Sequence, residues 1–501
     1  MRNKKTADRI PVHPLPPAEF SCALRSKDIE NIFSDCADFE MRTVICGALE
    51  LSVCWIDGIV SGTNVAEDVL RPLTDESRTG DVLSARRCIS LLMHSAVYSY
   101  SVKRRGSVDE LVKDLTHGSC AVIFDSLGEA LTFEVRSDKT RSVSEPTLEK
   151  SLKGGKDSFV ETLRVNTALV RRRVCSPKLK LIENAVGRKT HTNVAIMYID
   201  GVVSPATVEE LTSRLDGLDV DSLVAAGTLE EYIVDNPRSP WPQLLHTERP
   251  DRFAMYLLDG RVGLLVDGLP VALVLPASFD QFMRVTSDAS MHFTVATSLT
   301  ILRYAALILS LLLPAFYAAV SIYHQEMLPV SLLQSIISAK QGVPFSTATE
   351  LISMMLAFSL LQEAGLRLPN PIGDTVSIIG ALIVGQSAVE ARVVSPIAII
   401  VVALSSIACY TLPSHDMGSA VRIARFLLLL AAIVAGLYGV CVVLTLILLQ
   451  LASMDNFGVN YTSPLSDDKP WSLLRLLLRP PKPLNKLRAD NLNTPDKRRQ
   501  I

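Results

Sequence analysis

Apolar positions divide the chain into two parts of different character. Up to about residue 290, short apolar runs alternate with charged and polar positions, which is typical of soluble α/β domains. Long runs without Lys, Arg, Asp or Glu begin only beyond residue 299. The pattern therefore predicts an α/β soluble N-terminal region followed by an all-α multi-span membrane domain, with the boundary near residue 291.

The soluble part contains an internal repeat. CWIDGIVS, which ends at Ser61, matches MYIDGVVS, which ends at Ser204, and the segments that begin at Ser107 and Arg249 match at nearly the same offset. Two matches in register predict two related subdomains.

Each copy has the pattern of a strand, a turn and a helix. In the second copy, the apolar run at residues 194–199 ends in Asp-Gly, Ser204 can cap the next helix, and Gly217 can end it. The Asp267-Gly268 dipeptide between two apolar runs predicts a hairpin.

The repeated Asp-Gly dipeptides are candidate coupling turns. Asp57-Gly58 and Asp200-Gly201 end the matching apolar runs of the two copies. Asp and Gly are common where a strand turns into a helix, so we interpret both as turns and not as catalytic or phosphate-binding loops.

The repeat and the hydropathy together predict five parts. They are a flexible arm at residues 1–24, soluble subdomains at 25–150 and 151–290, a membrane domain at 291–453 and a basic cytosolic tail at 454–501. The arm is Pro-rich and has no apolar core like that of a signal peptide, so we expect a cytosolic N-terminal half.

Four segments are apolar and long enough to span a hydrocarbon core of about 30 Å. They are residues 299–320, 372–389, 393–412 and 426–452. A fifth segment, residues 348–364, contains two glutamates and follows a stretch broken by Pro and Gly, which favours a re-entrant or amphipathic piece over a simple span.

Two charge signals conflict over the number of spans. The tail after Met454 carries nine basic and five acidic residues, which places it in the cytosol by the positive-inside rule. Four spans agree with that placement but put Arg422 and Arg425 outside, whereas five spans put these arginines inside and export the tail. We favour four spans plus a re-entrant piece.

Polar groups at membrane depth cost a few kcal/mol each and normally face a partner or a water-filled path. The candidate ion-path residues are Glu363, Gln386, Glu390, Asp374 and Glu350. Rings of such acids, one per copy of the chain, would favour cations. The alternative is pairing within the membrane, for instance of Glu390 with Arg392 or of Arg303 with an acid.

Two basic segments raise the question of anion binding. The KGGK segment at Lys153 lacks the spacing of a phosphate-binding loop and is interpreted as a linker. The run Arg171, Arg172 and Arg173 could bind phosphates or lipid head groups, or it could form a salt-bridged face. Both interpretations stay open.

Composition argues against several function classes. A net charge of -2 and the lack of a basic, aromatic patch make nucleic acid an unlikely partner. The nine cysteines show no C-x-x-C spacing and the eight histidines no H-x-x-x-H spacing, so no metal, cofactor or enzyme is predicted. The seven cysteines of the soluble half suit reduced core thiols in the cytosol.

Six blocks of sequence resemble those of a known family. They are VETLRVNTALVRRRVCSPKLK from Val160, VAIMYIDGVVSPATVEEL from Val194, DNPRSPWPQLLHTERPDR from Asp235, HQEMLPVSLL from His324, LRLPNPIGDTVSIIGALIVGQSAVEARVVSPIAIIVVAL from Leu366 and FGVNYTSPL from Phe457. Their order and spacing, over roughly residues 40–470, resemble the GerA family of spore germination proteins, specifically the A subunit of the germinant receptor.

The resemblance implies a function and partners. It implies a subunit of the spore inner membrane that assembles with a transporter-like B subunit and a lipoprotein C subunit, self-associates into a ring and couples nutrient sensing to monovalent cation release. Two alternatives stay open: an A-like paralogue that works with the dipicolinate-release channel, and a stand-alone secondary transporter. The transporter would normally show inverted repeats within the membrane part, and the sequence shows a clear repeat only in the soluble half.

Overall fold

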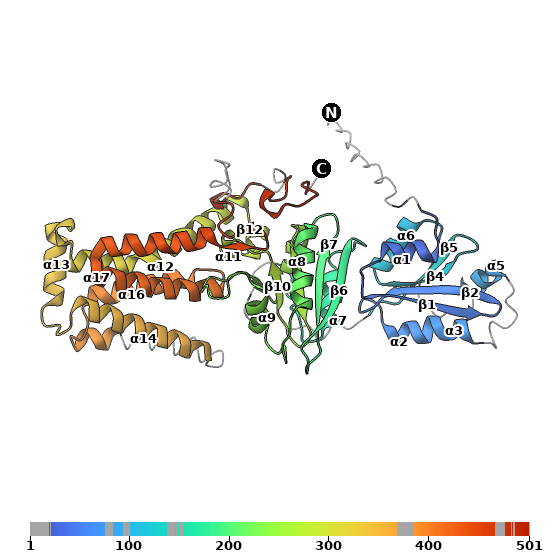
Figure 1. Ribbon diagram of the computed structural model, residues 1–501, viewed down its shortest axis with the longest axis horizontal. Helices are drawn as coiled ribbons and strands as arrows, with labels where there is room; N and C mark the ends of the chain where they lie inside the picture. The colour runs from blue at the N-terminus through green and yellow to red at the C-terminus, as the bar shows by residue number, and fades with distance from the viewer. Residues whose placement is uncertain are drawn as a thin grey trace, which may run out of the picture.

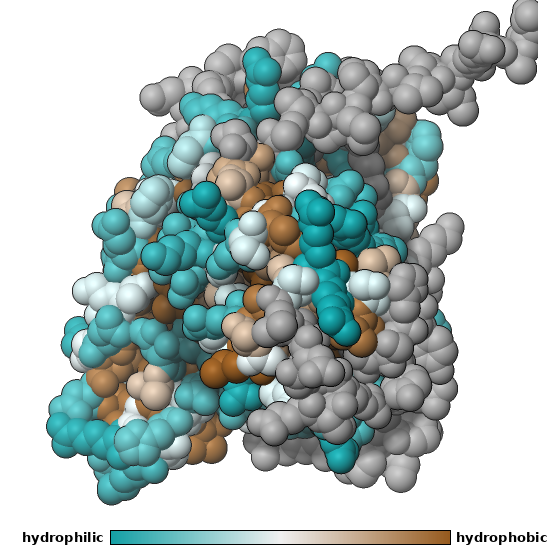
Figure 2. All heavy atoms as spheres, turned by 90° about the vertical axis from the view of Figure 1, so that its right-hand side faces the viewer, coloured by the Kyte–Doolittle hydropathy of each residue, from teal (hydrophilic) through white to brown (hydrophobic). Residues whose placement is uncertain are grey.

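The computed structural model describes residues 20, 22–75, 84–93, 101–137, 146, 149, 154–367, 385–465, 476–481, 483 and 486–499. The molecule is elongated, with the two sheets and the helical part following one another along its long axis (Figure 1). The end face of the first subdomain mixes hydrophilic and hydrophobic residues (Figure 2). Exposed large apolar side chains instead gather in the helical part, for example Leu302, Ile308, Leu360 and Val434.

The first subdomain is an antiparallel sheet covered on both faces. Its strands are β1 (Phe39–Cys46), β2 (Leu49–Ile56), β3 (Val102–Arg105), β4 (Ser119–Phe124) and β5 (Glu129–Glu134), in the order β1-β2-β4-β5-β3. One face packs against α1 (Ser26–Ile32) and α6 (Val108–Thr116). The other packs against α2 (Gly62–Asn64), η1 (Val65–Leu70), α3 (Arg71–Thr74) and α5 (Ala85–Leu91).

The second subdomain repeats this plan. Its strands are β6 (Leu179–Val186), β7 (Thr192–Ile199), β8 (Leu245–Thr247), β9 (Val262–Val266) and β10 (Ala272–Leu275), in the order β6-β7-β9-β10-β8. The helices α7 (Leu163–Arg171) and α10 (Pro250–Leu258) cover one face, and α8 (Pro205–Asp216) and α9 (Ala226–Ile233) cover the other. The identical strand order confirms the predicted duplication.

Local signals in the second subdomain are also confirmed. Pro205 opens α8 and Gly217 ends it, although the Ser204 side chain makes no capping hydrogen bond. Asp267 and Gly268 lie in the β9–β10 hairpin. The carboxylate of Asp267 also accepts a hydrogen bond from the Leu163 amide at 3.0 Å, which ties the hairpin to the start of α7.

The helical part begins two residues after the predicted boundary. Its helices are α12 (Phe293–Ile322), α13 (Val330–Lys340), α14 (Thr347–Arg367), α16 (Pro396–Tyr410) and α17 (His415–Ser453), with the short helix η5 (Gln325–Met327) between α12 and α13. Among the described residues, α12 and α17 are long and apolar enough to cross a membrane. Most of the predicted segment 372–389 lies outside the described residues.

Helix α17 reverses direction in its middle. Ala435 and Gly436 have non-helical backbone angles, and Gly436 has φ 59 and ψ -143. A straight helix of 39 residues would extend about 58 Å. Both ends instead reach the same strand region of the second subdomain, because Asp416 contacts His246 and Asn456, just after the helix, contacts Gln243.

The segment at residues 426–452, expected as a single span, is therefore divided between two arms in the structure. Residues 415–434 form an outgoing arm, which leads away from the soluble half, and residues 437–453 form a returning arm. The returning arm, in red, leads back to β12 (Val459–Asn460) beside the second subdomain (Figure 1). The apolar pattern concealed the turn because it continues through Ala435 and Gly436 without a polar residue or a proline.

Candidate functional site

Glu350, a candidate ion-path residue, is fully buried between helices. Its Oε2 accepts hydrogen bonds from the amide and hydroxyl of Ser395 at 3.0 and 2.7 Å, and its Oε1 lies 3.8 Å from Lys340 Nζ. Ser395 is the N-cap of α16, where a carboxylate is favoured by the partial positive charge of the helix end. Within one chain, Glu350 thus links the start of α14 to the start of α16.

The other candidate ion-path residues do not join Glu350 in a cluster. Glu363, Gln386 and Glu390 are exposed, and Asp374 lies outside the described residues. Among the described residues, no ion pair joins Glu390 to Arg392, whose guanidinium lies against Gly342 instead. An ion path between copies of the chain therefore stays a prediction.

Among the described residues, the Asp57-Gly58 turn contacts the other subdomain, whereas the Asp200 amide donates to the Lys178 carbonyl of its own subdomain at 2.8 Å. Asp57 Oδ2 lies 3.2 Å from Arg164 Nε on α7. A Cβ on Gly58, which has φ 87, would come within 2.9 Å of the Arg164 carbonyl oxygen, so the turn fits closely on the second subdomain. Asp200 and Gly201 are exposed, and no atom lies within 4 Å of a Cβ built on Gly201.

A buried ion pair joins the two subdomains beside this turn. Arg171 Nε and Nη2 each donate to a carboxylate oxygen of Asp38 at 2.7 Å, and Nη1 donates to the Leu179 carbonyl at 2.7 Å. The two side chains are 1% and 0% exposed. Burial alone would lower the pKa of Arg171, but the charge and hydrogen bonds of Asp38 raise it above its ordinary value, so the guanidinium stays charged.

The other arginines of the run also have internal partners. Arg172 Nη2 donates to the Ser137 carbonyl at 2.8 Å, and Arg173 pairs with Asp157. The structure therefore favours the salt-bridged alternative for the run over an anion site.

His246 makes the first of several contacts among the described residues that join the soluble half to the helices. It lies in β8, with Nδ1 2.9 Å from Asp416 in the first turn of α17 and Nε2 3.3 Å from Glu230 on α9. Burial lowers the pKa of His246, but the hydrogen bonds to Asp416 and Glu230 raise it to about 10. A charged imidazole thus bridges a soluble helix and the outgoing arm.

The second contact is the return of the chain after α17. The strands β11 (Asp455–Asn456) and β12 enter the second subdomain, where Asn456 Nδ2 donates to the carbonyls of Gln243 and Ala277. The guanidinium of Arg214 lies 4.4 Å from the Phe457 ring, and the buried Tyr461 packs on Phe279 and Phe282. We call residues 454–461 the re-entry segment.

The third contact is made by the linker before α12 and by the C-terminal tail. Arg303 donates to both oxygens of Asp288 at 2.6 and 3.0 Å, so the pairing that the sequence left open is present. Arg479 donates to the Asp288 carbonyl.

The end of the basic tail lies on the soluble half. Arg488 donates to the Leu258 carbonyl at 3.0 Å, and Arg499 pairs with Asp259.

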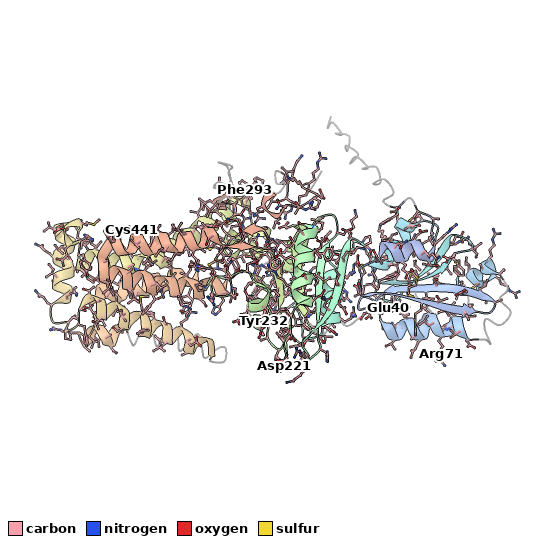
Figure 3. The ribbon with its side chains drawn as sticks, viewed as in Figure 1. Glu40, Arg71, Asp221, Tyr232, Phe293 and Cys441 are labelled. Atoms are coloured by element: carbon pink, nitrogen blue, oxygen red, sulfur yellow. The ribbon has the colours of Figure 1, made fainter. Side chains whose placement is uncertain are left out.

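Together these contacts make the junction one continuous core. Trp241 and Phe253 of the second subdomain share a buried cluster with Met417 and Leu451 of the two arms and with Tyr461. Figure 3 shows Phe293 at the start of α12 near this junction and Cys441 out on the helices. Sequence reasoning missed His246 and the re-entry segment, although the block FGVNYTSPL carried the signal of an apolar, aromatic stretch inside the expected tail.

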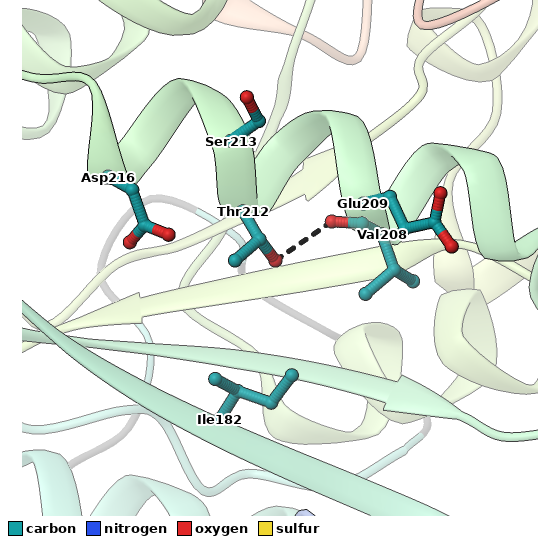
Figure 4. Close-up of a pocket in the computed structure, with 6 residues that line it drawn as sticks. All are labelled: Ile182, Val208, Glu209, Thr212, Ser213 and Asp216. Carbon is teal, nitrogen blue, oxygen red and sulfur yellow. Dashed lines mark hydrogen bonds between the residues drawn. The ribbon is translucent and has the colours of Figure 1, made fainter.

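The described surface offers a shallow groove away from this junction. It lies between α8 and β6 and is lined by Ile182, Val208, Glu209, Thr212, Ser213 and Asp216 (Figure 4). Thr212 donates to the Val208 carbonyl of its own helix. Among the described residues, no group of three His, Cys, Asp or Glu side chains could hold a metal ion.

The chain is similar to proteins of known families along most of its length. Residues 27–491 match the family described as Bacillus/Clostridium GerA spore germination protein. The chain is 36% identical to "Spore germination protein KA" of Bacillus subtilis (strain 168), over 90% of this chain and 82% of that protein. It is 32% identical to "Spore germination protein GerLA" of Bacillus cereus, over 94% and 95% of the two chains.

One solved structure is also similar. It is the crystal structure of the N-terminal domain of the A subunit of the Bacillus megaterium spore germinant receptor GerK3. It is 29% identical, covers 50% of this chain and 93% of its own, and has a TM-score of 0.39.

Proposed function

This chain belongs to the GerA family of spore germination proteins, and we propose that it is the A subunit of a spore germinant receptor. In this proposal it is a non-enzymatic, multi-pass protein of the bacterial inner membrane. It assembles with a transporter-like B subunit and a lipoprotein C subunit and couples nutrient sensing to monovalent cation release. The match across both halves of the chain carries the proposal, since the soluble and helical parts both lie within residues 27–491.

The continuous core at the junction supports a coupling role. A shift in the second subdomain can reach both arms of α17 because Trp241, Met417 and Leu451 pack in one cluster. Tightly packed elements can adopt only a few discrete packing arrangements, so they transmit such shifts better than a flexible linker does. The buried Arg171–Asp38 pair extends the same rigid connection to the first subdomain.

The path of α17 supports a cytosolic soluble half and tail. The tail contacts the soluble half through Arg488, which supports a topology with both on one side of the membrane. With α17 counted as two passes, Arg422 and Arg425 lie on the outgoing arm near the soluble half, and the conflict between these arginines and the basic tail disappears.

The proposed cation path lies between copies of the chain. Glu363, Gln386 and Glu390 are exposed on helices of a single copy, so they would meet their equivalents when copies form a ring. Glu350 has a different role in this proposal, since its carboxylate is held by Ser395 and anchors α14 to α16.

The test measures cation release from spores. Spores of a strain that lacks the chain are complemented with wild type, Glu363→Gln, Glu390→Gln or the matched control Glu231→Gln, which changes an exposed acid of α9. Potassium release after addition of nutrient broth is measured together with the amount of assembled receptor.

We expect at least fivefold slower release, or altered potassium-to-sodium selectivity, in the two helical variants, with normal assembly. Wild-type release in both variants would remove these acids from the path. Normal germination without the chain in every nutrient mixture would contradict the receptor role itself.

A further inference from the structure

Arg425 is a buried cation without an acidic partner among the described residues. It lies on the outgoing arm and is 3% exposed. Its Nη1 donates to Ser405 Oγ on α16 at 3.2 Å, whereas Nε is enclosed and makes no hydrogen bond. Arg422, one turn earlier on the same face, is partly exposed and donates to Ser419 Oγ at 2.9 Å.

Two other buried arginines of the chain show what is missing here. Arg171 is held by Asp38, and Arg249 is held by Asp251. A buried charge without a counter-charge costs several kcal/mol, so such a group normally recruits an anion. For Arg425 and Arg422 the described part of the chain supplies hydroxyl groups alone.

The level of the two arginines along the helix indicates where the anion comes from. Met417 and Ala420, on the soluble side of the pair, pack in the core shared with Trp241. Leu428 and Leu429, beyond the pair, pack in the core of the helical part. The arginines thus lie where the soluble half ends, which is the head-group level of a bilayer that surrounds the helices.

Apolar side chains of the same arm suit the rest of a lipid. Ile423 and Leu427 are 52% and 49% exposed. They lie on the side of the helix next to Arg422 and opposite Arg425. A lipid whose phosphate reaches Arg422 can therefore place an acyl chain against these side chains.

We propose that Arg422 and Arg425 bind the phosphate group of a membrane lipid in the leaflet next to the soluble half. Guanidinium groups donate paired hydrogen bonds to phosphate oxygens, and the pair carries two positive charges against one phosphodiester, which favours a net anionic head group. The lipid phosphate contacts the partly exposed Arg422 and supplies the negative charge that Arg425 lacks among the described residues. The inference rests on the proposed membrane location and is independent of ion conduction.

The test uses the full chain, purified in detergent and given phosphatidylglycerol as the probe. Native mass spectrometry measures the fraction of chains that retain the lipid, in wild type, Arg425→Gln, Arg422→Gln and the control Arg188→Gln, which changes an exposed arginine of the soluble half. Circular dichroism checks the fold of each variant. A second series replaces phosphatidylglycerol with phosphatidylcholine, and a third adds millimolar inorganic phosphate.

We expect at least a fivefold loss of retained phosphatidylglycerol in Arg425→Gln and Arg422→Gln, with Arg188→Gln like wild type. If Arg425→Gln fails to fold, the partly exposed Arg422 decides the outcome. Wild-type retention in folded Arg422→Gln would overturn the proposal, and so would displacement of the lipid by inorganic phosphate, which would identify a free-phosphate site. The lipid-binding assay uses purified protein and requires no germination phenotype. A failure of the proposed receptor function in spores can therefore be distinguished from a failure of lipid binding.

Discussion

The Arg171–Asp38 pair connects two subdomains that a linker alone would leave free to move. Both side chains are nearly inaccessible, and Arg171 also donates to the Leu179 carbonyl at the start of β6. Removing one member of such a pair destabilises the fold more than replacing both members by apolar residues, because the remaining charged group stays buried without a partner. The junction between subdomains is therefore expected to be sensitive to single substitutions.

Arg171→Ala should destabilise the soluble half by about 3–5 kcal/mol, because it leaves the carboxyl group of Asp38 buried without its partner. Hydrogen–deuterium exchange of the β6 amides in the full chain measures the loss. The matched control is Arg188→Ala, which breaks an exposed pair with Asp219 and should cost no more than about 1 kcal/mol. Equal protection of β6 in the two variants would contradict the predicted role.

His246 predicts a pH dependence at the junction with the helices. Because its pKa in the folded chain is raised to about 10, its stabilising charge is fully present below the ordinary histidine pKa of about 6.5 and is lost as the pH rises through about 10. The thermal unfolding midpoint of the full chain should therefore fall more between pH 7 and pH 10.5 in wild type than in His246→Gln.

The control for this measurement is His191→Gln, since His191 is an exposed histidine of the same subdomain. That variant should keep the wild-type pH dependence. If His246→Gln and wild type lose stability in parallel over this range, the charged bridge between Glu230 and Asp416 does not hold the junction.

Single residues show how far the sequence could predict the site. Polar groups in apolar segments could be recognised, and Glu350 and Arg303 do lie in or beside helices as expected. Their partners could not be recognised, because Ser395 and Asp288 are distant in sequence and ordinary in type. Five of the soluble cysteines are buried as expected, but Cys22 and Cys175 are exposed.

Elements with local turn chemistry were predictable, and the reversal in α17 was not. The β9–β10 hairpin and the start of α8 follow from Asp-Gly and Ser-Pro, which act on the backbone within a few residues. The turn at Ala435 and Gly436 is instead held by a segment distant in sequence, since Tyr323, just after α12, donates to the carbonyls of Ile433 and Val434 at 2.8 and 3.1 Å. Glycine within an apolar run gives no comparable signal.

Gly436→Ala should destabilise the helical part by about 1–3 kcal/mol or more, because its backbone angles are those of glycine. A Cβ there would also lie 3.0 Å from His324 Nε2 and 3.2 Å from Tyr323 Cβ. The thermal unfolding midpoint in detergent and the amount of protein in the membrane measure the effect. Gly418→Ala on the outgoing arm is the control, since the nearest atom to its Cβ is 3.9 Å away. A Gly436→Ala protein as stable as this control would argue against the reversal.

The whole molecule is a chain that leaves the second subdomain and returns to it. Hydropathy located the departure well, since α12 begins at Phe293. The return of the chain to the soluble half could not be predicted in the same way, because the re-entry segment precedes a basic stretch whose charge indicates a tail. In the structure, Tyr461 of this segment is fully buried in the soluble core. A contact formed between residues about 180 positions apart, such as Phe279 with Tyr461, leaves no trace in local periodicity.

The path of the chain predicts which positions are reached from each side of the membrane. Cys88 and Cys120 are poor reporters, since burial raises the pKa of both thiols, that of Cys88 to about 12, and neither is accessible. Cys175 is exposed on the soluble half and serves instead. Gln341, exposed after α13 at the far end of the helices, reports the opposite side.

In protoplasts, a membrane-impermeant maleimide should label Gln341→Cys before lysis but native Cys175 only afterwards. The background carries Cys22→Ser and Cys441→Ser, with Cys175→Ser added wherever an introduced cysteine is tested, so that each chain keeps one exposed thiol. Leu465 is 42% exposed just after the re-entry segment. The variant Leu465→Cys should behave like Cys175, because the returning arm brings the chain back to the soluble half.

A single continuous pass through α17 would put the two ends of that helix on opposite sides of the membrane. Labelling of Leu465→Cys in intact protoplasts, with Cys175 still protected, would therefore contradict the two-armed α17 and restore the conflict between the arginines and the tail.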